Sequence, residues 1–265
     1  MSISNLLPKD LTLVVASLVA VTGATTASAE QYLAISYGYA DLDTSSNAGS
    51  FSNGFTTGSG STIPAGTVLP AGTSVGWTTE FDSGDSVSLA YGFAINEYIR
   101  AEIQYARQDN DVARHAGVVV ADSLNIDTED AGVLITGSGN LGASVAAIVA
   151  DGRGSVETDY IMLSAYYDFA GDADFTPFVG FGLGYADVDV RFNPSGVGIV
   201  DDSDSGLAYQ ASVGASWAIS DAIDVVGELK YRASDEFAVA TTLFPARLEI
   251  DNESTNVEIG LRYKF

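Results

Sequence analysis

The sequence predicts an all-β fold: a transmembrane, antiparallel, up-and-down β-barrel of eight strands with short periplasmic turns and long extracellular loops. Two observations lead to this prediction. Apolar and polar residues alternate over segments of about ten residues, the pattern of a strand with two different faces. The connections between these segments are alternately long and short. A soluble β-sandwich has no reason to gather its long connections at one end, whereas outer-membrane barrels do so.

Residues 1–29 are expected to be a cleaved signal peptide. Lys9 precedes the apolar stretch Leu11–Val21, and Ala27-Ser28-Ala29 supplies the small residues of a cleavage site. The apolar stretch is too short for a membrane-spanning helix, which needs about 20 residues. The mature chain, residues 30–265, is therefore expected to be exported to the cell outer membrane as one barrel domain.

Each predicted strand has an apolar, often aromatic face and a polar or small-residue face. The last segment is the clearest, because Val257, Ile259 and Leu261 share a face with Tyr263 and Phe265. The eight expected strands are residues 33–40, 86–93, 99–105, 161–169, 178–185, 209–217, 223–232 and 256–265. Long loops are expected at residues 41–85, 108–158, 191–205 and 233–254, and short turns near Asn96, at 170–173 and at 220–222.

Composition excludes several functional classes. The chain has 35 acidic and 11 basic residues, a net charge of −24, which argues against nucleic-acid binding. Its 13 Tyr and 12 Phe argue against wholesale disorder. With no Cys and one His, it lacks the residues for disulfides, thiolate chemistry or a multi-histidine metal site.

Charged residues occupy predicted lumen positions of the strands. An eight-stranded barrel is just wide enough for side chains to fill its interior, and enclosed charges must be paired. We therefore favour an ion-pair plug over a gate or selectivity filter, and expect Glu228 and Arg262 to be energetically coupled. The network is expected to comprise Arg100, Glu102, Glu228, Lys230, Arg232, Glu258 and Arg262.

Two features outside the strands resemble enzyme or cofactor motifs. Residues 137–142 read Gly-Ser-Gly-Asn-Leu-Gly, a literal G-x-G-x-x-G, but they lie in a predicted loop with no room for a dinucleotide-binding sheet. We interpret them as turns of a mobile surface loop. His115 is expected to be an exposed loop residue. Neither enzymatic activity nor a cofactor is expected.

Two acidic runs are weak candidates for Ca²⁺ or Mg²⁺ at the cell surface. One contains Asp201, Asp202 and Asp204, and the other is Asp127–Asp130. Neither follows the EF-hand pattern, so a solvated acidic face is the favoured interpretation. Divalent ions bridging these loops to lipopolysaccharide are a further hypothesis.

Three stretches resemble the small eight-stranded outer-membrane proteins of the OmpA-type and opacity-protein superfamily, the outer membrane protein β-barrel domain family. They are the Pro- and Gly-rich Thr176–Tyr185, the segment from Tyr209 to Ala218 followed by Tyr231-Arg232, and the terminal strand. The resemblance implies that Tyr263 and Phe265 form the signal read by the barrel-assembly machinery. The family's His-x-Ser pattern of lipid A-modifying enzymes is absent at His115, and no peptidoglycan-binding domain is expected after Phe265.

The expected function is that of a non-enzymatic, monomeric outer-membrane barrel with acidic surface loops, acting in envelope structure or surface interaction. Its expected partners are outer-membrane lipid, lipopolysaccharide and the barrel-assembly machinery. A narrow ion-conducting channel and a surface adhesin are the alternatives.

Overall fold

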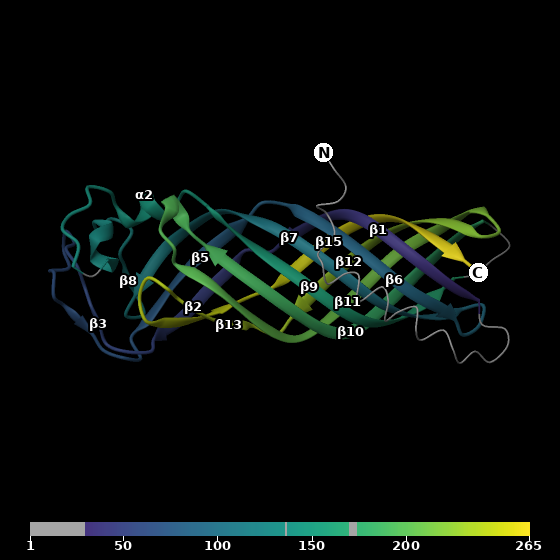
Figure 1. Ribbon diagram of the computed structural model, residues 1–265, viewed down its shortest axis with the longest axis horizontal. Coiled ribbons are helices and arrows are strands. Elements are labelled where there is room, and N and C mark those ends of the chain that lie inside the picture. Colours follow the sequence, from purple (N-terminus) through teal and green to yellow (C-terminus); the bar gives the residue numbers. More distant parts are fainter. Residues whose placement is uncertain (1–29, 136, 170–173) are drawn as a thin grey trace.

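The computed structural model describes residues 30–135, 137–169 and 174–265, which form one long antiparallel barrel (Figure 1). Each barrel strand pairs with the next along the chain, and β1 pairs with β15 to close the ring. The predicted up-and-down barrel of eight strands is therefore confirmed. These strands are β1 (Gln31–Leu42), β6 (Gly84–Ala94), β7 (Ile99–Val120), β9 (Gly154–Asp168), β10 (Phe175–Phe192), β11 (Val200–Ser220), β12 (Ile223–Ser234) and β15 (Glu253–Lys264).

The predicted signal peptide and the turn at 170–173 lie outside the described residues. In the described part of the chain, neither the α-helix nor the 3₁₀ turns have the length and hydrophobicity that a bilayer-crossing helix requires.

The segments predicted as long loops are largely folded, so this part of the prediction is wrong in extent. They carry the barrel wall onward, away from the end where β1 begins and β15 ends (Figure 1). Four strands extend the wall: β2 (Ser45–Phe51), β5 (Ser74–Phe81), β13 (Phe237–Ala240) and β14 (Ala246–Ile250). The end is covered by β3 (Phe55–Thr56), β4 (Val68–Leu69), β8 (Leu124–Asn125), α2 (Val145–Val149) and the 3₁₀ turns Ala131–Leu134 and Pro194–Gly196. We call these elements, with the adjoining parts of β7, β9, β10 and β11, the extension.

Strand β10 runs from the lower part of the barrel into the extension. Its apolar face is on the outside in the lower part and on the inside in the extension. In its first part Phe181, Leu183 and Tyr185 point outward and are exposed, opposite inward glycines. Beyond Ala186, Asp187 and Asp189 point outward, while inward Val188, Val190 and Phe192 are buried. The outer face thus changes from one suited to lipid to one suited to water, and the interior changes in the opposite sense.

The interior of the extension is a packed apolar core. The rings of Phe51 and Phe55 stack with centroids 5.3 Å apart, and Phe244 lies 5.6 Å from Phe51. Inward residues of the strands surround these rings; the buried members include Trp77, Val112, Phe192, Phe237, Val239, Leu248 and Ile250. The core makes the extension a folded part of the barrel, since burial of apolar area is the main favourable term in folding.

Candidate functional site: a charged lumen below an apolar extension

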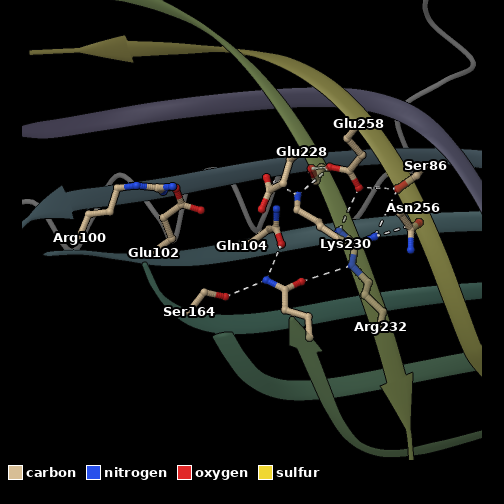
Figure 2. Close-up of polar contacts among 12 residues, drawn as sticks. Ser86, Arg100, Glu102, Gln104, Ser164, Glu228, Lys230, Arg232, Asn256 and Glu258 are labelled. Atoms are coloured by element: carbon tan, nitrogen blue, oxygen red, sulfur yellow. Dashed lines mark hydrogen bonds and ion pairs between the residues drawn. The ribbon is translucent and has the colours of Figure 1, made fainter. Parts of the chain in front are cut away.

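Lys230 and Arg232 of β12 are buried at the centre of the lumen (Figure 2). Lys230 Nζ lies 2.7 Å from Glu258 Oε2 and 3.1 Å from Glu228 Oε2. Arg232 Nη2 lies 3.1 Å from the other oxygen of Glu258. Two cations therefore face two carboxylates, so this cluster is electrically balanced. Because both partners are enclosed, removing either one would leave an uncompensated charge.

Neutral side chains complete the hydrogen bonding of this cluster. Ser86 and Ser88 donate to the Glu258 carboxylate at 2.8 and 2.9 Å. Arg232 Nε donates to Gln210 Oε1 at 3.3 Å, and the Gln210 amide donates to Ser164 at 2.8 Å. These contacts come from five strands around the barrel, so the cluster ties opposite walls together.

A second charged cluster lies nearer the periplasmic end. Arg100 is 2.5 Å from Glu102 and 3.0 Å from Asp168, and Tyr32 donates to Glu102 at 2.7 Å. The Arg100 guanidinium stacks 3.7 Å from the centre of the Tyr166 ring. A side chain at Gly180 would collide with that ring, since a Cβ atom there would lie 2.4 Å from Tyr166 Cδ1. The glycine in β10 therefore makes room for the stack.

Glu228 and Arg262, which we expect to be energetically coupled, form no ion pair with each other among the residues that the structure describes. Glu228 stands opposite Glu258 in the β12–β15 ladder, whereas Arg262 stands opposite Asp224. Arg262 Nη1 lies 3.7 Å from Asp224 Oδ2, and Lys264 Nζ lies 2.9 Å from Asp224 Oδ1. Asp224 belongs to the polar face of its segment, but the sequence alone could not fix the register that brings it to Arg262.

Little space is left between the two clusters. The cavity that Glu102, Glu228 and Arg262 line measures about 20 Å³, close to the space one water molecule needs. A larger cavity of about 320 Å³ lies at the periplasmic mouth, where Arg100, Asp168 and Lys264 contribute to the lining. The lumen is thus filled at mid-height and widens at its periplasmic end.

His115 is buried in β7, so the expectation of an exposed loop histidine is wrong. Its ring packs edge-on against Phe192 at 4.8 Å and Trp77 at 6.3 Å. Asn47 donates to Thr79 Oγ1, which is also hydrogen-bonded to His115 Nδ1 at 2.8 Å. Burial lowers the pKa of His115 to about 4, because the surrounding core does not stabilise an imidazolium.

The acidic run Asp127–Asp130 is structural, which corrects its interpretation as a solvated face. The Glu129 carboxylate accepts backbone N–H groups of Ser61, Thr62 and Ile63 and the Thr62 hydroxyl. These hydrogen bonds lower the pKa of Glu129 to about 2 against the opposing effect of burial. The side chain therefore fastens one extension segment to another.

The Asp130 carboxylate binds the backbone of the glycine-rich motif at residues 137–142. It accepts the backbone N–H groups of Leu141 and Gly142, both at 2.8 Å. In a dinucleotide-binding loop such groups would face a phosphate. Here they hold a carboxylate of the same chain, which agrees with the interpretation of the motif as turns.

The candidate metal ligands Asp201, Asp202 and Asp204 point in two directions along β11. Asp202 and Asp204 accept the N–H groups of Ala240 and Ala238 at 2.8 and 2.9 Å, while Asp201 faces Arg191 at 3.7 Å. The two inner carboxylates therefore link β11 to the edge of β13. Within the residues described, no group of three or more potential ligands forms a metal site.

Acidic residues encircle part of the outer wall, above its apolar band. Asp85, Asp109, Glu157 and Asp189 are successive cross-strand neighbours on β6, β7, β9 and β10. Asp159 and Asp187 form a second such pair. We call these six residues the acidic collar. Tyrosines at the edge of the apolar band reach up to it, since Tyr37 donates to Asp85 and Tyr105 to Asp159, both at 2.6 Å.

The predicted assembly-signal residues lie where the barrel closes. Tyr263 and Phe265 are exposed on the outer face, with ring centroids 6.1 Å apart. The Phe265 N–H donates to the Gln31 carbonyl at 2.9 Å, so the chain ends within the β1–β15 seam.

The sequence match to a known family identifies the class of this barrel. Residues 11–265 match the family described as outer membrane protein beta-barrel domain. The chain belongs to this family. It is accordingly a protein of the Gram-negative outer membrane, with its apolar band in lipid, and the extension lies on the side away from the short periplasmic turns.

Individual relatives of this outer-membrane barrel are distant. Outer membrane protein PagN of Salmonella typhimurium is 28% identical over 115 residues, which cover 39% of this chain. The match spans about half (48%) of PagN. The outer membrane protein OprG from Pseudomonas aeruginosa has the same fold at 15% identity, with a TM-score of 0.50 over 90% of this chain and 96% of OprG.

Proposed function

We propose that the protein is a non-enzymatic, non-conducting outer-membrane barrel that acts through its folded surface extension, in envelope structure and surface interaction. The filled interior is the observation that carries this proposal. The charged clusters leave a gap of about 20 Å³ within the membrane zone, and an apolar core occupies the barrel above them. An ion moving through would have to break buried ion pairs and then cross hydrocarbon, and both steps are costly.

The surroundings of His115 support a non-enzymatic role. Its ring contacts Thr79, Trp77 and Phe192, none of which is charged. A His general base is normally oriented by a carboxylate and placed beside a nucleophile at an accessible site. His115 is instead buried, and we assign it to core packing.

Single-channel recording of the folded protein in a planar bilayer tests the proposal. We expect no conductance steps above background, and the same result for Glu80→Gln, a matched change in the exposed Arg114–Glu80 pair. Protease protection of the membrane zone in the same preparation verifies insertion. Reproducible cation-favouring steps that change in Glu228→Gln or Arg262→Gln would instead establish a pore with those residues as its filter.

The folded extension favours a surface-interaction role, with adhesion as the more specific form. Replacing residues 53–71 by an Asn-Gly turn would remove the outer part of the β2–β5 hairpin while keeping both strands. If the extension mediates adhesion, cells carrying this variant attach less well to host surfaces, with unchanged amounts of folded barrel. Unchanged attachment would contradict adhesion and leave the envelope role.

The proposed partners follow from the outer wall. We assign the apolar band to lipid, the acidic collar to lipopolysaccharide bridged by divalent ions, and the terminal strand to the barrel-assembly machinery, acting on a monomer. Phe265→Ala should lower the amount of folded barrel in the outer membrane. Phe175→Ala, which removes a similarly exposed aromatic side chain at the first residue of β10, should not. Equal losses of folded barrel in the two variants would contradict a signal role for Phe265. For the acidic collar, a Ca²⁺ affinity weaker than tens of millimolar would exclude bridging to lipopolysaccharide.

A further inference from the structure

Two stretches of the extension are uncharged, in a chain whose net charge is −24. Residues 44–79 and 131–150 contain no Asp, Glu, Lys or Arg. They contain β3, β4 and α2, and together with the turn around β8, which carries Asp122 and Asp127, they cover the end of the molecule (Figure 1).

A cavity of about 190 Å³ lies at this end. Its walls come from the β3–β4 segment, from the turn around β8 and from the first 3₁₀ turn, and they are almost entirely hydrocarbon. The principal lining side chains are Ile63, Leu69, Val120, Leu124, Ile126 and Val133.

The polar groups at the cavity already have partners. Thr57 Oγ1 donates to the Pro64 carbonyl at 3.1 Å and accepts the Thr67 N–H at 3.1 Å. The Thr62 hydroxyl is held by Glu129. A ligand with a charged group would lose its hydration here without gaining a hydrogen-bonding partner, which is costly.

One wall of the cavity is fixed by specific contacts rather than left as a loose loop. Glu129 holds the backbone of residues 61–63, as described above. Gly58 donates to the Val133 carbonyl at 3.1 Å. A Cβ atom at Gly60 would lie 2.4 Å from Glu129 Oε2, so the glycine permits this close approach. The cavity is therefore preformed, which reduces the ordering cost of binding.

We propose that this cavity binds a small, uncharged, apolar molecule of about the size of one aromatic ring. A fully enclosed apolar cavity of about 150 Å³ in another protein binds benzene. The cavity here is partly open, since its lining residue Leu124 is 48% exposed, and its volume of about 190 Å³ suits a single ring compound. This inference goes beyond the proposed function and does not depend on whether the barrel conducts.

The test uses fluorobenzene and 4-fluorobenzoate as neutral and charged probes, followed by ¹⁹F NMR with the full-length protein in lipid nanodiscs. The key variant is Leu69→Trp, which fills the cavity. Val68→Trp is the matched control, because Val68 is its neighbour in β4 but is 65% exposed and does not line the cavity. Partitioning of the probe into lipid is common to all samples and cancels between variants.

We expect saturable fluorobenzene binding by the wild type and by Val68→Trp, at least tenfold weaker binding by Leu69→Trp, and none of 4-fluorobenzoate. Leu124→Trp, at a more exposed lining position, provides a second filling variant if Leu69→Trp does not fold. The absence of a saturable component in the wild type would overturn the proposal. Equal binding by wild type and filling variants, or equally tight binding of the benzoate, would also do so.

Discussion

The lumen in the membrane zone and the interior of the extension are built by the same strands with opposite chemistry. The lumen holds Arg100, Glu102, Lys230 and Arg232 in ion pairs, whereas the extension buries Phe51, Phe192 and Leu248. In the membrane zone, the apolar faces of the strands are turned to lipid. In the extension, they are turned inward because water surrounds the wall.

This difference shows that the solvent outside a barrel decides what lies within it. In lipid, the outer face must be apolar, so alternation places polar residues inside, where they need partners. In water, the same alternation is used as in a soluble β-sheet, and the interior becomes a hydrophobic core. The lumen is therefore held by specific pairs, and the extension by packing.

The largest expected effect comes from breaking the lumen cluster. Glu258→Ala removes the carboxylate shared by Lys230 and Arg232 and leaves buried positive charge, which should cost about 3–5 kcal/mol. Urea unfolding in lipid vesicles measures the loss. A loss below about 1 kcal/mol, the range of exposed pairs, would show that water reaches the cluster.

A double-mutant cycle in the same assay sharpens the assignment of partners. Lys230→Met and Glu258→Gln should show a larger coupling energy than Glu228→Ala and Arg262→Ala, because only the first pair is joined by a hydrogen bond, at 2.7 Å. Equal couplings would contradict the pairing of Lys230 with Glu258 and of Arg262 with Asp224.

Weakening the extension core should open the extension while the membrane zone stays folded. Leu248→Ala removes a fully buried side chain, and the expected cost is about 2–5 kcal/mol. Limited proteolysis should then cut within residues 237–250, leaving the lipid-embedded strands protected. Simultaneous loss of protection in both zones would mean that the barrel unfolds as one unit.

Acid should destabilise the extension through His115. The folded-state pKa is about 4 against about 6.5 in the unfolded chain, so the unfolded state binds more protons between these values. The free energy of unfolding should therefore fall as the pH falls from about 6.5 to 4, by about 3 kcal/mol in all. His115→Asn should flatten this dependence, and an identical slope in the variant would contradict the assignment.

The smallest expected effect lies on the acidic collar. Asp109 has Asp85 and Glu157 as cross-strand neighbours, and burial together with repulsion from Asp111 raises its pKa. Asp109→Asn should therefore stabilise the protein by roughly 0.2–1 kcal/mol in urea unfolding. Asp41→Asn, whose cross-strand neighbour is Thr255, is the control and should have no such effect. A loss of stability in Asp109→Asn would point to a favourable contact of the carboxylate.

The sequence by itself determined the barrel, its strand number and order, and the inward position of Lys230 and Glu258. These follow from local alternation and from connection length, which are properties of adjacent residues. It also contained the reversed alternation of residues 186–192, although the predicted strand ended at residue 185.

Only the tertiary structure decided the partners. The pairing of Arg262 with Asp224, the burial of His115 against Phe192, and the fastening of residues 61–63 by Glu129 join residues far apart in the sequence. Such contacts depend on strand register and on how the extension folds back over the barrel. Local pattern specifies neither, because a segment's own residues determine which face is polar but not which distant group will meet it.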